Sequence, residues 1–95
     1  MIRISGKRIF IQFSKCPMLR NCEDVEVDIP VLPLPGNLFD GFYFLNEEYR
    51  GIATKQQVKF FVEDVQHTFL DATQYVLIVM QVIPSAKQIT PPFHN

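Results

Sequence analysis

Residues 54–71, TKQQVKFFVEDVQHTFLD, carry the strongest periodic pattern in the chain, and this pattern decides the predicted fold. Thr54 is followed three residues later by Gln57, which is the spacing of a capping box that closes the first turn of a helix. The apolar residues that follow recur at intervals of three and four, as on one face of an α-helix. They are Val58, Phe61, Val62, Val65 and Phe69. The pattern predicts an amphipathic helix over about 54–71.

The next stretch, residues 75–83 (YVLIVMQVI), is too apolar to alternate between a buried and an exposed face. Strands of this kind are covered on both faces, so we expect a central strand that ends at Pro84. One helix covers only one face of a sheet. A second copy of the chain is one way to cover the other face.

The first residues, MIRISGKRIFIQF, alternate between apolar and polar side chains around Gly6 and Lys7. A two-residue loop with glycine first is typical of a type II′ turn, so this stretch predicts an N-terminal β-hairpin. A single long strand with a bulge at Gly6 is the alternative. The hairpin would place Arg3, Arg8 and Phe10 on one face.

Charge is divided between this region and the one that follows. The first twenty residues carry five basic side chains and no acid, whereas residues 21–49 carry seven acids and no base. Within the acidic part, residues 24–29 (DVEVDI) alternate and predict a further strand. If this strand pairs with the N-terminal one, acids and bases meet on the outer face of the sheet, where each pair contributes about 0.2–1 kcal/mol.

Three prolines within residues 30–35 (PVLPLP) predict an extended connector, because proline cannot donate a backbone hydrogen bond to a sheet. Residues 42–45 are a candidate for a short strand, and residues 46–51 for a polar turn. Together these elements predict a small α+β domain over residues 1–84, with one helix packed on a mostly antiparallel sheet of about four or five strands. Residues 85–95 are expected to form a flexible or loosely docked tail.

The composition favours one folded domain without a strongly charged partner. Hydrophobic residues make up 47% of the chain, nine residues are phenylalanine, and the formal net charge is -1. The first residues lack the apolar core of a signal peptide, and no apolar stretch reaches the length of a membrane span. We therefore expect a cytoplasmic protein with reduced thiols and no membrane partner, located in the host cytoplasm if a virus encodes it.

No catalytic or nucleotide-binding motif is found in the sequence, so we expect neither enzyme activity nor a cofactor. Cys16 and Cys22 lack the second pair of ligands that a zinc site needs, and no metal is expected. Two free thiols are the expected state of these cysteines, with a disulfide as the alternative. Glu63 and His67 stand four residues apart on the predicted helix, where they can form a surface ion pair.

One phenylalanine does not fit the predicted helix, because Phe60 falls on its polar side. A partner-binding face centred on Phe60 and flanked by Gln56, Glu63 and His67 has the spacing that a groove on another protein can accept. Phe10, on the polar face of the predicted hairpin, is a second candidate for the partner site. Cover by the connector or the tail is the alternative for both aromatic side chains.

Three classes of function are consistent with these patterns. The first is a small non-enzymatic protein-interaction module, acting as an adaptor, a subunit or an inhibitor of a larger protein, as virus- or phage-encoded accessory proteins do. The second is a single-stranded nucleic-acid binder that uses Arg3, Arg8 and Phe10, although one aromatic on a neutralised face argues against it. The third is an assembly component, a dimer or higher oligomer joined by pairing of β-strand edges.

Overall fold

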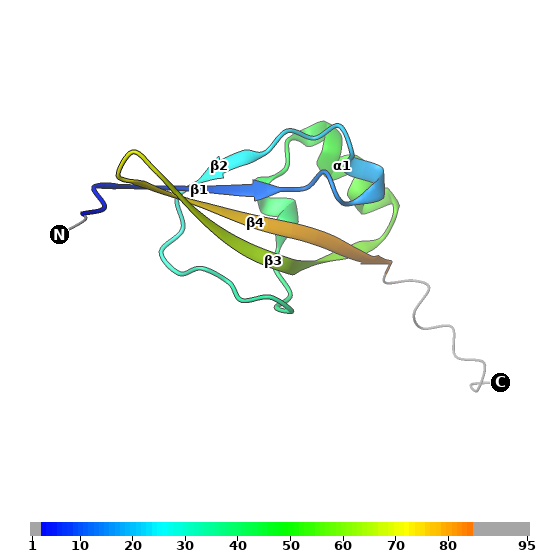
Figure 1. The fold of residues 1–95 in the computed structure, drawn as a ribbon. Helices are drawn as coiled ribbons and strands as arrows, with labels where there is room; N and C mark the ends of the chain where they lie inside the picture. The colour runs from blue at the N-terminus through cyan, green and yellow to red at the C-terminus, as the bar shows by residue number, and fades with distance from the viewer. Residues whose placement is uncertain (1–2, 85–95) are drawn as a thin grey trace.

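The computed structural model describes residues 3–84, which form a small α+β domain with a four-stranded sheet and one α-helix (Figure 1). The elements are β1 (Gly6–Gln12), the 3-10 turn η1 (Pro17–Leu19), β2 (Val25–Val27), the 3-10 turn η2 (Gly41–Phe44), α1 (Glu47–Lys55), β3 (Val58–Leu70) and β4 (Thr73–Pro84). The strand order across the sheet is β2-β1-β4-β3. The sheet is mixed, because β1 pairs parallel with β4 whereas the other two pairs are antiparallel. The predicted fold class is confirmed, with different elements in several places.

The predicted helix over about 54–71 is wrong, because most of these residues form β3. Val58, Phe60 and Val62 are buried, whereas Lys59 between them is exposed, as in a strand. A bulge between Val62 and Asp64 then shifts this alternation by one residue. On the core side of the sheet, the apolar residues of β3 are therefore those at positions 58, 60, 62, 65 and 69. Across the bulge, their spacing resembles that of a helix.

The helix of the structure, α1, begins in the segment predicted as a polar turn (46–51) and ends at Lys55, at the start of the segment predicted as a helix. Asn46 caps it, since the side-chain Oδ1 accepts a hydrogen bond of 2.9 Å from the backbone N–H of Tyr49. Glu47 and Glu48 occupy the first turn and Lys55 the last, so the charges complement the helix dipole.

The predicted hairpin at Gly6 and Lys7 is also wrong, because the chain runs straight through both residues as β1. β1 lies between β2 and β4, so it gains backbone pairing on both of its edges. The hairpin of the structure joins β3 to β4 instead. Its turn residues Asp71 and Ala72 have φ of 50° and 65°, both in the left-handed region that a type I′ turn requires. The carbonyl of Ala72 accepts hydrogen bonds from the backbone N–H groups of Ser5 (2.8 Å) and Gly6 (3.3 Å).

Two strand predictions are confirmed. Residues 24–29 contain β2, and residues 75–83 lie in β4, which is an inner strand of the sheet. The middle of β4 is covered on both faces: Ile78 and Met80 belong to the core, and Val79 on the opposite face is 1% exposed.

The connector, defined here as residues 28–45, covers the core face of the sheet. Side chains from it that pack against the core are Ile29, Leu32, Phe39, Phe42 and Phe44. The predicted strand at 42–45 is wrong, since residues 41–44 form η2. Gly41 in η2 is buried so tightly that a Cβ there would lie 2.9 Å from the ring of Phe60. A side chain at this position would force the ring to move.

Helix α1 packs against η1 rather than across the sheet. It lies at the end of the sheet away from the β3–β4 turn (Figure 1). The connector thus takes the place on the core face that the prediction gave to the helix. Within residues 3–84, no helix has the length and apolar composition needed to cross a lipid bilayer. The predicted tail at 85–95 lies outside the described residues.

Candidate functional site

The predicted centre of the partner site, Phe60, is a core residue. It is 2% exposed and makes edge-to-face contacts with the rings of Phe13 and Phe42, at centroid distances of 5.5 and 5.0 Å. An anchor of this kind must be exposed to reach another protein. The prediction that Phe60 is exposed on the outer face of a helix is therefore wrong.

The residues predicted to flank Phe60 do not share one helix face with it. Gln56 is the C-cap of α1, while Glu63 and His67 lie on β3, with Glu63 at the bulge. The helical spacing that would pair Glu63 with His67 does not exist in a strand. The Nδ1 atom of His67 instead lies 2.9 Å from the Nε2 atom of Gln74 on β4.

The basic residues near the N-terminus are partly neutralised. Arg8 and Phe10 share a face as predicted, with the guanidinium carbon 5.2 Å from the ring centroid, and Phe10 is half-buried. Arg8 donates two hydrogen bonds, of 2.9 and 2.8 Å, to the carboxylate of Glu26 on β2. These bonds lower the pKa of Glu26. Arg3 is exposed and precedes β1. The predicted meeting of acids and bases is confirmed at the Arg8–Glu26 pair, which reduces the attraction of this face for phosphate.

Both cysteines are free thiols in buried positions. Cys16 lies 3.6 Å from the carbonyl oxygen of Met80, and its burial raises the pKa of the thiol to about 12. Burial also raises the pKa of Cys22. Within residues 3–84, His, Cys, Asp and Glu side chains form no group of three or more that could hold a metal ion. Thiols that stay protonated are weak nucleophiles and weak metal ligands.

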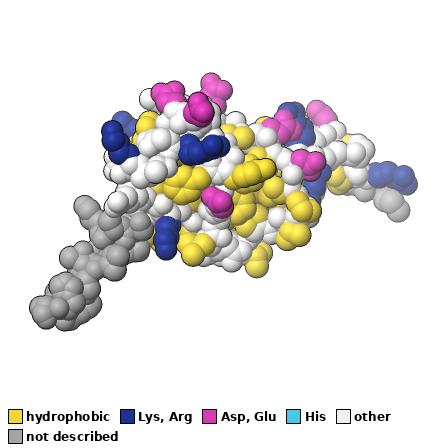
Figure 2. Space-filling model, turned by 180° about the vertical axis from the view of Figure 1, so that it is seen from behind, with side chains coloured by type: hydrophobic (Ala, Val, Ile, Leu, Met, Phe, Trp, Pro, Cys, Tyr) yellow, Lys and Arg dark blue, Asp and Glu magenta, His cyan; other side chains and the backbone are white. Residues whose placement is uncertain are grey.

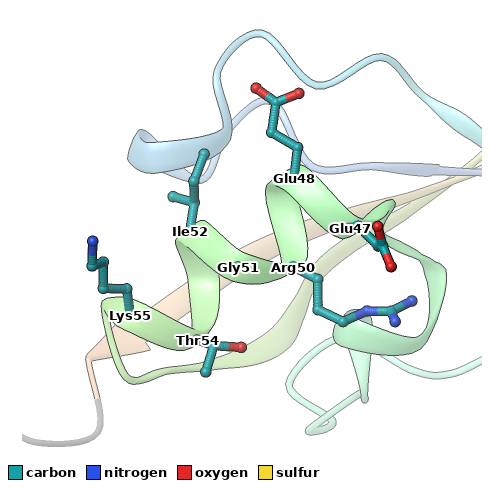
Figure 3. Close-up of a pocket in the computed structure, with 7 residues that line it drawn as sticks. All are labelled: Glu47, Glu48, Arg50, Gly51, Ile52, Thr54 and Lys55. Carbon is teal, nitrogen blue, oxygen red and sulfur yellow. The ribbon is translucent and has the colours of Figure 1, made fainter.

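An open hollow of about 860 Å³ lies along α1. Its lining residues are Glu47, Glu48, Arg50, Gly51, Ile52, Thr54 and Lys55. Figure 3 shows that their side chains point away from the helix in different directions rather than toward one centre. Arg50 is also engaged, because it donates hydrogen bonds to the carbonyls of Phe42 (3.1 Å) and Leu45 (2.8 Å). This surface does not bring polar groups together around a ligand.

Exposed apolar side chains instead gather on the connector. Four of them are strongly exposed: Val31 (77%), Leu34 (67%), Leu38 (68%) and Tyr43 (75%). The rings of Phe39 and Phe44 stack beside them at a centroid distance of 5.7 Å and an angle of 8°. We call these six residues the connector face. Figure 2, which views the molecule from the side opposite to Figure 1, shows hydrophobic side chains concentrated on the middle of this side.

Two shallow hollows lie on the connector face, and both are lined by Phe39 and Asp40. One, of about 280 Å³, also includes Val31, Tyr43 and Phe44, together with Ile29. The other, of about 290 Å³, also includes Leu38, Lys59 and Phe60. The exposed carboxylate of Asp40 forms no ion pair with any of the described residues. The face thus offers two apolar hollows that share the carboxylate of Asp40, with Lys59 beside it in one of them.

Comparison with known proteins does not assign this surface: the chain matches no protein-family model, and no similar curated protein or solved structure was found. Sequence reasoning missed the connector face. The signal for it is the density of aromatic residues in FDGFYF (39–44), which overlaps the strand predicted over residues 42–45. Three successive aromatic residues cannot all face the core of a strand, so some of them had to be exposed.

Proposed function

We propose that this protein is a small non-enzymatic protein-interaction module that binds another protein through the connector face. The observation that carries the proposal is the group of four strongly exposed apolar side chains next to a stacked aromatic pair. A group of exposed apolar side chains of this kind is characteristic of protein-binding sites, because covering apolar surface releases about 25 cal/mol per Å². An adaptor, a subunit or an inhibitor of a larger protein would use the face in the same way.

The apolar hollows and the charge of the connector face indicate which kind of partner it can bind. Each hollow accepts an apolar side chain, and Tyr43 supplies both ring area and a hydroxyl at the edge. Asp40, which both hollows share, attracts a cation and has Lys59 beside it in one hollow; along the sequence, residues 21–49 carry seven acids and no base. The expected partner therefore presents apolar side chains beside a lysine or arginine.

The proposal is tested by selecting peptides from a random displayed library against the purified protein and measuring their affinity by fluorescence polarisation. Selected peptides should combine apolar side chains with a basic residue. Tyr43→Ala should weaken their binding at least about tenfold, as expected for a central aromatic contact. Asp40→Asn should reduce the salt dependence of binding.

Leu70→Ala is the control, because Leu70 is also a strongly exposed apolar residue (60%, against 75% for Tyr43) but lies on the β3–β4 hairpin rather than on the connector. This variant should bind the peptides as the unmodified protein does. Peptides that bind Tyr43→Ala and the unmodified protein equally well would refute the connector face as the binding site. Failure to select any binding peptide would count against the proposal as well.

A further inference from the structure

Strand β3 is an edge strand whose outer side is covered along only part of its length. The connector pairs with it at the first part: Leu38 forms a bridge with Phe61, and the N–H of Gly36 donates to the carbonyl of Val62 at 2.7 Å. Beyond the bulge, no backbone group within residues 3–84 pairs with this side of β3, and the N–H of Val65 donates to the side-chain Oδ1 of Asp64 at 2.9 Å. We call residues 64–70 on this side the free edge. It extends for about 24 Å.

The hydrogen bonds before the bulge fix which backbone groups point outward after it. The N–H of Val62 donates to the carbonyl of Asn37 at 2.9 Å, so both backbone groups of Val62 point away from β4 and toward the connector. The carbonyl of Phe60 also accepts a hydrogen bond from the connector. Outward groups alternate with inward ones along a strand, and the bulge shifts this alternation by one residue. The residues that present N–H and C=O groups at the free edge are therefore Val65, His67 and Phe69.

We propose that the free edge binds a second copy of this chain, with the two β3 strands antiparallel around a two-fold axis at His67. His67 then lies opposite His67 of the other copy, and Val65 opposite Phe69. Each opposed pair can exchange two backbone hydrogen bonds, and in the Val65–Phe69 pair the N–H of Val65 exchanges the Asp64 side chain for the carbonyl of Phe69. The result is a continuous sheet of both copies. This proposal rests on the strand edge and is independent of the connector-face proposal.

The ends of the free edge fit this arrangement. The two-fold axis places residue 72 of one copy opposite residue 62 of the other. Strand β3 of the first copy therefore ends, at the turn of Asp71 and Ala72, beside Val62 of the second copy. This Val62 is where the connector of the second copy begins to pair with β3 of that same copy. The uncovered length is thus filled at both ends without displacing the connector.

The side chains of the free edge are also compatible with a two-fold axis. Val65 opposite Phe69 is a favourable pair of a β-branched and an aromatic residue on neighbouring strands. Phe69 (57% exposed) and Leu70 (60% exposed) are the large apolar side chains that the pairing would cover. Asp64 lies opposite Leu70, so no two acids face each other within the paired segment.

Acids do meet at its two ends, where Asp71 of one copy approaches Glu63 of the other. Both side chains are exposed, so their repulsion is modest and is screened by salt. Asparagine tolerates the left-handed backbone of position 71, so Asp71→Asn removes the repulsion without disturbing the turn. It should tighten the dimer about two- to fivefold at low salt, and less at high salt.

The experiment is sedimentation velocity of the purified full-length chain from about 1 to about 500 μM, a range suited to a small interface. A monomer–dimer equilibrium should appear. His67→Pro should weaken it at least about tenfold, because proline lacks the N–H that points to the edge yet leaves the bonds to β4 intact. His67→Ala is the matched control: it also removes the imidazole but keeps the N–H, and it should dimerise within about threefold of the unmodified chain.

A second measurement covers the case in which His67→Pro does not fold. Opposed residues of a hydrogen-bonded pair have Cα atoms about 5.5 Å apart, within the range that a disulfide can bridge. On mild oxidation, His67→Cys should give a covalent dimer, whereas Thr54→Cys on α1 should not. A chain that stays monomeric at every concentration, or equal dimerisation of the proline and alanine variants with no covalent dimer from His67→Cys, would overturn the proposal.

Discussion

Replacement of Phe60 by alanine separates the observed strand from the helix that the periodicity predicts. In the structure the Phe60 ring is buried, contacts two other rings and fills the space above Gly41. Truncation of such a side chain costs about 3–5 kcal/mol, including the lost ring contacts and the remaining cavity. A domain of this length has a total stability of about 4–12 kcal/mol, so the loss is a large part of it.

Phe61→Ala is the matched control, because Phe61 is the next residue, is half-buried and faces the other side of the sheet. Its removal should cost only about 1 kcal/mol. Urea unfolding followed by far-UV circular dichroism measures both losses. With a slope of about 1 kcal/mol per M, Phe60→Ala should lower the midpoint by about 3 M or more. Phe60→Leu, which leaves a smaller cavity, replaces it if the alanine variant does not fold. If Phe61→Ala is the more destabilised of the two variants, the assignment of β3 is wrong.

Two further predictions concern the hairpin turn and the buried thiol. Ala72→Gly should stabilise the protein by about 0.5–1 kcal/mol in the same unfolding assay, because alanine pays a steric cost at φ of 65° that glycine avoids; a destabilised variant would contradict this. Cys16 is a group whose neutral form is favoured by folding, since burial raises its pKa from 9.0 to about 12. The contribution of Cys16 to stability should therefore be complete below about pH 9 and should decline as the pH rises toward 12. Over this range, the free energy of unfolding of the unmodified protein should approach that of Cys16→Ala. A constant difference between the two proteins would show that Cys16 does not titrate in this way.

The sequence predicts those elements whose patterns are local. β4 is recognisable because a long apolar run without alternation needs cover on both faces. β2 is recognisable from its alternation, and its pairing with β1 from the opposite charges of Arg8 and Glu26. These features give the central strand and its neighbours, whereas the helix of the predicted α+β class was placed over residues that form β3, and the helix of the structure is α1.

The wrong secondary-structure predictions arise where one local sequence pattern is compatible with two different structures. The bulge after Val62 spaces the apolar residues of β3 by three and four, so the pattern alone cannot distinguish the strand from a helix. The β3–β4 turn contains Asp71 and Ala72, which differ from the asparagine–glycine pair that usually marks such a turn. Gly6 and Lys7 resembled a turn, but pairing on both edges of β1 outweighs that preference.

The candidate site was harder to predict, because exposure depends on which segment covers which face. Once residues 58–70 form a strand, Phe60 joins the core, and the connector covers the face assigned to a helix. Short segments rich in proline and aromatic residues cannot bury every side chain against one sheet face. Val31, Leu34, Leu38 and Tyr43 therefore remain outside, where no periodic pattern marks them.

The connector links the two proposed surfaces physically. Through Gly36 and Asn37 it pairs with β3 up to Val62 and so sets one end of the free edge, while its aromatic residues form the connector face. Leu38 of the connector face pairs with Phe61 at the edge of β3, next to the free edge, whereas Tyr43 and the stacked rings of Phe39 and Phe44 lie farther along the connector. A dimer joined at β3 would consequently carry two connector faces in a fixed relation. A partner that presents two copies of its apolar and basic segment would then bind more tightly than one copy, because its second contact is intramolecular.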